Sequence, residues 1–220
     1  MDLISFVRFT FNTRYMTRWI YGGLILCIPV ANFFSLGFLS RASRLFIIAG
    51  MGLPTWQDKY DTWIEGIKLL FIFILYGAIP FFMFSCGFFL TTLTSITAFF
   101  GNIIITLSYV ALLICSFFLP FAFATYAEKM DFRDALEFEN IIRGIKEVFV
   151  EYIAGYIGVL ILLYVCRLII RIPYFIGFIV SSVLTYYVFL VATYYFTELY
   201  KKTTLTSLIE STEQPVSSKE

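Results

Sequence analysis

Leu69–Ala127 reads LLFIFILYGAIPFFMFSCGFFLTTLTSITAFFGNIIITLSYVALLICSFFLPFAFATYA, 59 consecutive residues without a charge. A helix rises 1.5 Å per residue, and about 20 apolar residues cross a bilayer core. A single helix of this length would project far beyond the membrane, so we expect two spans, near 67–90 and 99–125. Four polar residues mark the turn between them: Thr91, Thr92, Thr94 and Ser95.

Two further spans are expected near 151–171 and 174–197, and Pro173 separates them because proline interrupts helical hydrogen bonding. Of the 220 residues, 60% are hydrophobic and 14% are charged, and the mean hydropathy is +0.86. A soluble domain usually carries about 25% charged residues. The predicted fold class is therefore all-α integral membrane, with one polytopic domain over 1–200 and a disordered, cytoplasmic polar tail over 201–220.

The composition also argues against several functions. Histidine is absent, which removes the commonest general base and zinc ligand. The net charge of +1 creates no basic field for nucleic acid. No carboxylate lies at the centre of a predicted span, where an ion-coupled transporter normally has one. We therefore expect no enzyme activity, no cofactor, no metal and no nucleic-acid partner. Four cysteines within apolar runs are interpreted as packing thiols: Cys27, Cys86, Cys115 and Cys166.

Lysine and arginine orient the chain, because short cytoplasmic loops are enriched in both. The 91–98 turn has neither and is placed outside, whereas the segments 41–68 and 126–150 carry four each and are placed in the cytoplasm. The segment 19–40 has positive charge on both sides, which leaves two topologies open. As a re-entrant hairpin it keeps 14 of the 16 basic residues cytoplasmic, and as a plain span it places the N-terminal arm outside.

The residues within 19–40 favour the re-entrant hairpin. Pro29 removes a helical hydrogen bond, and Ala31-Asn32 suits a turn buried in protein, where non-helical backbone is tolerated at membrane depth. The predicted architecture is thus an N-terminal hairpin, four transmembrane helices and one cytoplasmic amphipathic helix over 131–149. The apolar face of that last helix combines Phe132, Leu136, Ile142, Ile145 and Phe149.

Three groups of side chains are candidate sites. The connector residues Arg41, Arg44 and Trp56 suit either an ordinary interfacial connector or a lipid-headgroup site. Near the outer end of the fourth span, Arg167 and Arg171 either snorkel to the interface, bind an anion or lipid phosphate, or form a buried ion pair. Two asparagines, Asn32 and Asn102, either cross-link helices by hydrogen bonds or line a polar cavity together with Ser35.

Glycine, proline and aromatic residues punctuate the segment 22–80. The pattern comprises Gly22-Gly23-Leu24, Ile28-Pro29, Leu36-Gly37-Phe38-Leu39, Arg41, Arg44, Gly50, Leu53-Pro54-Thr55-Trp56, Asp58, Gly66, Tyr76 and Pro80. It resembles the uncharacterised membrane family catalogued as domain of unknown function 4013, over roughly 1–200. The resemblance implies an all-helical multi-pass protein of a prokaryotic cell (inner) membrane, and it supplies no catalytic residues.

The expected function follows from the functions that the composition argues against. We expect a non-enzymatic accessory or scaffold subunit of a larger membrane assembly, whose partners are membrane lipids and other membrane protein subunits. The alternative is a lipid-handling or small-solute transport protein that uses the 19–40 hairpin as its cavity, since half-helices that meet in the membrane build many transporter sites.

An introduced Ser5→Cys tests the topology. The re-entrant hairpin predicts that a membrane-impermeant thiol reagent labels this cysteine only from the cytoplasmic side, because the N-terminal arm then stays in the cytoplasm. Labelling only from outside would show that 19–40 crosses the membrane.

Overall fold

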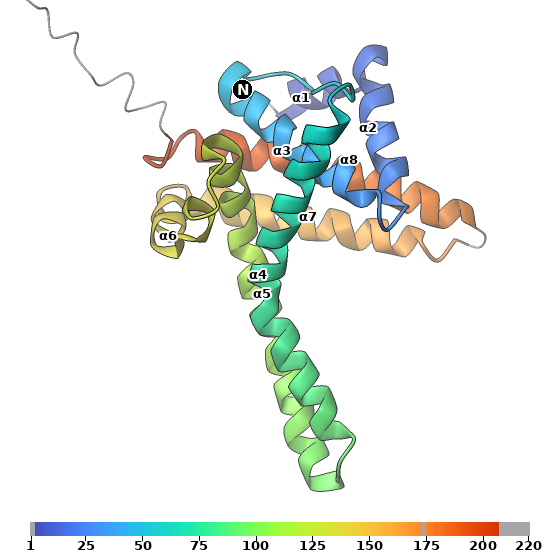
Figure 1. Cartoon of the computed structure of the whole chain (residues 1–220), viewed down its shortest axis with the longest axis vertical. Coiled ribbons are helices and arrows are strands. Elements are labelled where there is room, and N and C mark those ends of the chain that lie inside the picture. Colours follow the sequence, from blue (N-terminus) through green and yellow to red (C-terminus); the bar gives the residue numbers. More distant parts are fainter. Residues whose placement is uncertain (1–2, 173–174, 207–220) are drawn as a thin grey trace, which may run out of the picture.

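The computed structural model describes residues 3–172 and 175–206, and every regular element within them is a helix (Figure 1). Pro173 and the tail residues 207–220 lie outside the described residues. Four helices are long and apolar enough to cross a membrane, which confirms the four predicted spans: α4 (Lys59–Thr91), α5 (Ser95–Lys129), α7 (Phe149–Ile169) and α8 (Phe175–Tyr200).

These helices form two hairpins that diverge. The α4–α5 hairpin extends away from the rest of the molecule, and the α7–α8 hairpin runs across its base (Figure 1). A capping box closes the α4–α5 turn, since the backbone N–H of Thr94 donates to Thr97 Oγ1 (2.9 Å) and that of Thr97 to Thr94 Oγ1 (3.3 Å). The predicted polar turn is therefore confirmed.

Two glycines bring the outer parts of α4 and α5 together. A Cβ atom on Gly87 would lie 2.9 Å from the carbonyl oxygen of Gly101, and one on Gly101 would lie 2.7 Å from that of Gly87. Any larger residue would force the two backbones apart. Small residues at helix crossings are the usual basis of close packing in membranes, where lipid and protein are equally apolar.

The N-terminal segment forms three helices: α1 (Leu3–Thr10), α2 (Thr13–Leu26) and α3 (Asn32–Ala49). The predicted break within 19–40 is present, because a turn replaces the helix around Pro29. The N–H groups of Ala31 and Asn32 both donate to the carbonyl of Ile28, at 3.0 Å each. Ile28 and Val30 are 55% and 71% exposed, so the turn presents apolar side chains outward.

The end of α2 contacts α8 near the middle of that helix. Ser182 Oγ donates to the carbonyl of Gly23 (3.1 Å), and the ring of Tyr186 packs against Gly22. These contacts place the last two turns of α2 against α8 between Ser182 and Tyr186. Re-entry itself, which depends on the position of the bilayer, stays a prediction.

The segment predicted as one helix over 131–149 is divided. Met130 ends α5 in the left-handed conformation (φ 57°), a 3₁₀ turn follows at Asp134–Leu136, and α6 runs over Phe138–Glu147. The prediction of the helix is therefore too long at both ends. The buried face of α6 comprises Ile141, Gly144 and Ile145, while Ile142 and Phe149 are 37% and 50% exposed.

Residues 201–206, the first part of the predicted tail, pack against α5 and α6. Thr206 Oγ1 donates to Glu128 Oε1 (2.9 Å), and Thr204 donates to Glu147 through both its N–H (2.9 Å) and its hydroxyl (2.7 Å). Two carboxylates from different helices thus hold this segment in place.

A close backbone crossing joins α3 to α4. A Cβ atom on Gly37 would overlap the carbonyl oxygen of Thr62, and one on Gly66 would overlap that of Phe33. Arg41 lies one turn beyond Gly37, and its guanidinium donates to Thr62 Oγ1 (2.9 Å). Backbone contact and a charged hydrogen bond therefore reinforce each other at this crossing.

Gly66→Ala should lower the free energy of unfolding by about 2 kcal/mol or more, because the added methyl group pushes α3 away from α4. Gly77→Ala is the matched control on the same helix, since nothing lies within 4 Å of its Cβ position. It should be neutral, or stabilising by up to about 1 kcal/mol through helix propensity. Thermal unfolding in detergent measures the stability of both variants. Equal losses of stability would show that the α3–α4 contact does not depend on the missing side chain at Gly66.

Candidate functional site

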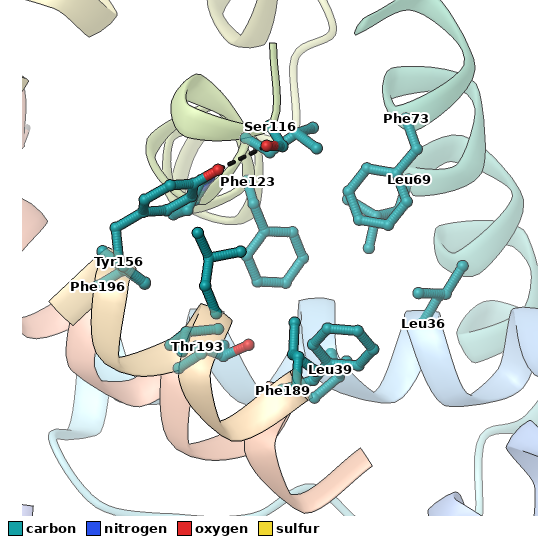
Figure 2. Close-up of a pocket in the computed structure, with 16 residues that line it drawn as sticks. Leu36, Leu39, Leu69, Phe73, Ser116, Phe123, Tyr156, Phe189, Thr193 and Phe196 are labelled. Carbon is teal, nitrogen blue, oxygen red and sulfur yellow. Dashed lines mark hydrogen bonds between the residues drawn. The ribbon is translucent and has the colours of Figure 1, made fainter. Parts of the chain in front are cut away.

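A half-open cavity of about 240 Å³ lies where the two hairpins diverge (Figure 2). It is smaller than the roughly 300–1,000 Å³ of pockets for drug-sized ligands, so it suits a slender group. Five helices contribute to the lining: α3 (Leu36, Leu39), α4 (Leu69, Phe73), α5 (Ser116, Leu119, Pro120, Phe123), α7 (Tyr156, Val159, Leu160, Leu163) and α8 (Phe189, Ala192, Thr193, Phe196).

Three lining residues have polar side-chain atoms: Ser116, Tyr156 and Thr193. Ser116 Oγ and the Tyr156 hydroxyl lie 2.6 Å apart in a hydrogen bond, drawn as the dashed line in Figure 2. Ser116 also donates to the carbonyl of Leu113 (3.0 Å). The Ser116 and Tyr156 hydroxyl groups bond to each other and to the backbone, so the cavity offers its occupant mainly hydrocarbon.

The same hydrogen bond belongs to a contact that holds α7 beside α5. One turn before Tyr156, the Tyr152 hydroxyl donates to the carbonyl of Phe117. The Phe117 ring lies edge-on to both tyrosine rings, with centroid distances of 4.9 Å and 5.2 Å. This aromatic contact joins the two hairpins along one side of the cavity.

The cavity lies in the part of the bundle nearer to α6. On α4, the lining residue Leu69 directly follows Lys68, which ends the charged first turns of that helix, and Phe73 lies one turn further on. Under the predicted topology this is the cytoplasmic half of the membrane. With that topology, lipid acyl chains would surround the cavity at this depth.

Two of the candidate residues hold the connector between α3 and α4: Arg41, which lies on α3, and Trp56, which lies in the connector itself. Arg41 Nη2 forms an ion pair with Asp58 (3.1 Å). The Trp56 ring stacks on Phe38 with centroids 4.4 Å apart, and its Nε1 donates to the carbonyl of Arg18 (3.1 Å). Both side chains thus hold the connector, whereas the third candidate, Arg44, is exposed.

The other sequence-based candidates do not line the cavity. Arg167 and Arg171 are exposed at the end of α7 and in the turn that follows it. Ser35 is buried and donates to the carbonyl of Gly22 (2.7 Å), next to Asn32 at the start of α3. Asn102 is exposed near the tip of the α4–α5 hairpin, on a part of the chain separate from these two.

Sequence reasoning missed the residues that form the cavity. The available signal was a hydroxyl group inside an otherwise apolar span, as at Ser116, Tyr156 and Thr193. That signal is weak, because serine and threonine also bond to their own helix backbone, as Thr106 does with the carbonyl of Asn102. No spacing in the sequence indicates which helices lie opposite one another.

Tyr156→Phe should lower the free energy of unfolding by about 1 kcal/mol, because it removes the interhelical hydrogen bond to Ser116 while keeping the ring contact. Tyr164→Phe, two turns further along α7, is the control, since that side chain is 62% exposed. Thermal unfolding of both variants in detergent is the measurement. Equal behaviour of the two would mean that the hydroxyl pair does not join α5 to α7.

Comparison with known proteins gives one family. No curated protein and no solved structure matches the chain, whereas the family described as a protein of unknown function (DUF4013) matches residues 20–196. The matched region extends from the middle of α2 nearly to the end of α8 and includes every residue that lines the cavity. The resemblance found in the sequence is confirmed: this chain, a multi-pass membrane protein by its four apolar helices, belongs to the DUF4013 family.

Proposed function

We propose that this protein is a non-enzymatic, lipid-handling membrane protein that holds an acyl chain in the cavity between its two hairpins. The observation that carries the proposal is the cavity itself, which is half-open and lined almost wholly by hydrocarbon. Under the predicted topology, this cavity would lie within the membrane. A polar solute would find few hydrogen-bond partners there, whereas an acyl chain needs none.

The physical basis is dispersion rather than the hydrophobic effect. Lipid tails are as apolar as leucine, so a chain gains nothing by leaving the bilayer for an apolar surface alone. An unfilled crevice, however, deprives its lining atoms of contacts on one side, and many weak contacts sum to a substantial energy. Filling this crevice with a chain that matches its narrow shape is therefore favourable.

The cavity differs from the one expected in the 19–40 hairpin. That hairpin contributes Leu36 and Leu39 to the lining, but its polar residues Asn32 and Ser35 lie elsewhere. The lining thus favours lipid handling over small-solute transport. The proposed setting is the cell membrane of a prokaryote, with the chain's C-terminus in the cytoplasm.

A second role, as accessory or scaffold subunit, is favoured by a different observation. The α4–α5 hairpin stands clear of the other helices (Figure 1). In the apolar 18-residue stretch of α5 that could cross a membrane, only 6% is buried inside the molecule. Among its outward side chains, Phe81, Phe82 and Ile96 are 73%, 70% and 76% exposed. Lipid or the spans of another subunit would cover this surface.

Photo-crosslinking with a phospholipid that carries a diazirine on its acyl chain tests the acyl-chain site. Labelled peptides should include cavity residues of α5 and α8. Ala192→Phe fills the cavity and should reduce labelling of these peptides roughly tenfold, equivalent to about 1.4 kcal/mol. Ile79→Phe adds a similar ring on the outward face of α4, where the native side chain is 65% exposed, and should leave labelling unchanged.

Two results would contradict this proposal. One is uniform labelling of every outward helix face with no excess at the cavity, and the other is an equal response of the two phenylalanine variants. Mild extraction from native membranes followed by mass analysis separates the two roles. Bound lipid on a monomer or homo-oligomer supports lipid handling, whereas larger subunits at fixed stoichiometry support the accessory role.

A further inference from the structure

One hydroxyl group of the cavity is free to bind an occupant. Thr193 of α8 lines the cavity and is 7% exposed. Within residues 3–172 and 175–206 its hydroxyl forms no hydrogen bond, whereas Ser116 and Tyr156 bond to each other. Figure 2 shows the Thr193 oxygen within the ring of lining side chains, on the side of Leu39 and Phe189. A buried hydrogen-bond donor thus faces the empty space of an otherwise apolar site.

The free hydroxyl contrasts with the way in which threonine usually behaves inside a helix. Thr125 Oγ1, for example, donates to the carbonyl of Phe121 four residues earlier (2.9 Å). The equivalent acceptor for Thr193 is the carbonyl of Phe189, and in the described part of the chain this bond is not formed. A buried O–H group without an acceptor costs free energy. An occupant that supplies an acceptor is therefore favoured over one that does not.

A count of donors and acceptors identifies the chemistry of that acceptor. A carbonyl oxygen accepts the hydrogen of Thr193 and brings no hydrogen of its own, so no donor is left over. An alcohol brings a second O–H group, and only one of the two hydrogens can lie between the two oxygens. An ionised group would need an opposite charge, and no described residue that lines the cavity is charged. A neutral carbonyl group is therefore the best match.

Thr193 also lies close to polar contacts between α3 and α8. One turn further along α8, the hydroxyl groups of Thr197 and Ser43 are hydrogen-bonded (2.9 Å). One turn beyond Thr197, the Lys201 ammonium group donates to the carbonyl of Phe46 (3.2 Å). Along α8, Thr193 is thus the point at which the hydrocarbon lining approaches a polar region. A carbonyl group at one end of a hydrocarbon chain suits such a border.

We infer that the hydrocarbon chain in the cavity carries a carbonyl group, and that the Thr193 hydroxyl donates a hydrogen bond to the oxygen of this group. This inference rests on the proposed acyl-chain site and assigns its ligand class. Two sources share the chemistry: the ester of a membrane lipid, and a neutral lipid such as a long-chain ketone. Thr193 is then a specificity-determining residue, because the apolar lining contacts any chain alike.

The test uses the full-length protein in vesicles of a dialkyl ether phosphatidylcholine, whose chains have no carbonyl group. An ether-linked lipid with a diazirine on its chain labels the cavity, and labelled peptides of α5 are quantified while a second lipid competes. Two matched pairs of competitors are compared. The first is diacyl against dialkyl phosphatidylcholine of equal chain length, and the second is a long-chain ketone against the alkane of equal length.

In wild type, a carbonyl competitor should halve the labelling at about a fivefold lower mole fraction than its carbonyl-free counterpart, which is the effect of about one hydrogen bond. The pair that shows this difference identifies the source of the carbonyl group. Thr193→Val keeps the shape of the side chain and removes the hydroxyl, so labelling should persist and the fivefold preference should disappear. Thr193→Ser keeps a hydroxyl and should retain the preference.

The matched control is Thr106→Val, which removes an exposed hydroxyl on α5 outside the cavity lining. Its preference for the carbonyl competitor should equal that of wild type. Thermal unfolding of Thr193→Val should also match wild type, since the hydroxyl has no partner in the described chain to lose. A change in competition without a change in stability would separate a role in binding from a role in folding.

Three outcomes would overturn the inference. They are equal competition within both pairs in wild type, a preference that persists in Thr193→Val, and a preference that is lost equally in Thr106→Val. In each of these cases the cavity is still labelled, so the acyl-chain site itself stands. Absence of excess labelling at the cavity in wild type is a different result, and it would remove the proposed function together with this inference.

Discussion

The rest of the structure depends on the backbone contact between α3 and α4. Because Gly37 and Gly66 lack side chains, each helix lies against the carbonyl groups of the other. From this position α3 also contacts α2, α5 and α8, so one short helix connects the N-terminal module to both hairpins. In a bilayer, where apolar surface alone gives no preference for protein over lipid, such shape-matched contacts decide which helices associate.

The cavity is a consequence of this connection. The two hairpins are joined through α3 and through the tyrosine contact between α5 and α7, and they separate beyond these points (Figure 1). Helices that meet at one end and diverge leave a crevice that side chains fill only in part. The candidate acyl-chain site therefore results from the way in which the hairpins cross, rather than from a dedicated binding motif.

The residues that carry the family resemblance have structural roles. Gly37 and Gly66 form the α3–α4 crossing, Trp56 holds the connector, and the Tyr76 hydroxyl donates to the carbonyl of Ala135 (2.9 Å). Gly23 permits α2 to approach α8, since a Cβ atom there would lie 2.6 Å from Val183 Cα. In this chain, the glycine and aromatic residues that carry the family resemblance thus determine where neighbouring segments pack together.

The sequence by itself determined the membrane class, the four spans, the polar turn near Thr94 and the break at Pro29. Each depends on local composition, because a helix needs about 20 apolar residues to cross and polar or proline residues interrupt it. Only the tertiary structure decided the short α6, the pairing of Arg41 with Asp58 and the five-helix cavity. A span that is apolar on every side gives no signal of which face meets another helix. The sequence therefore does not show that Ser116 faces Tyr156, and only the packed helices do.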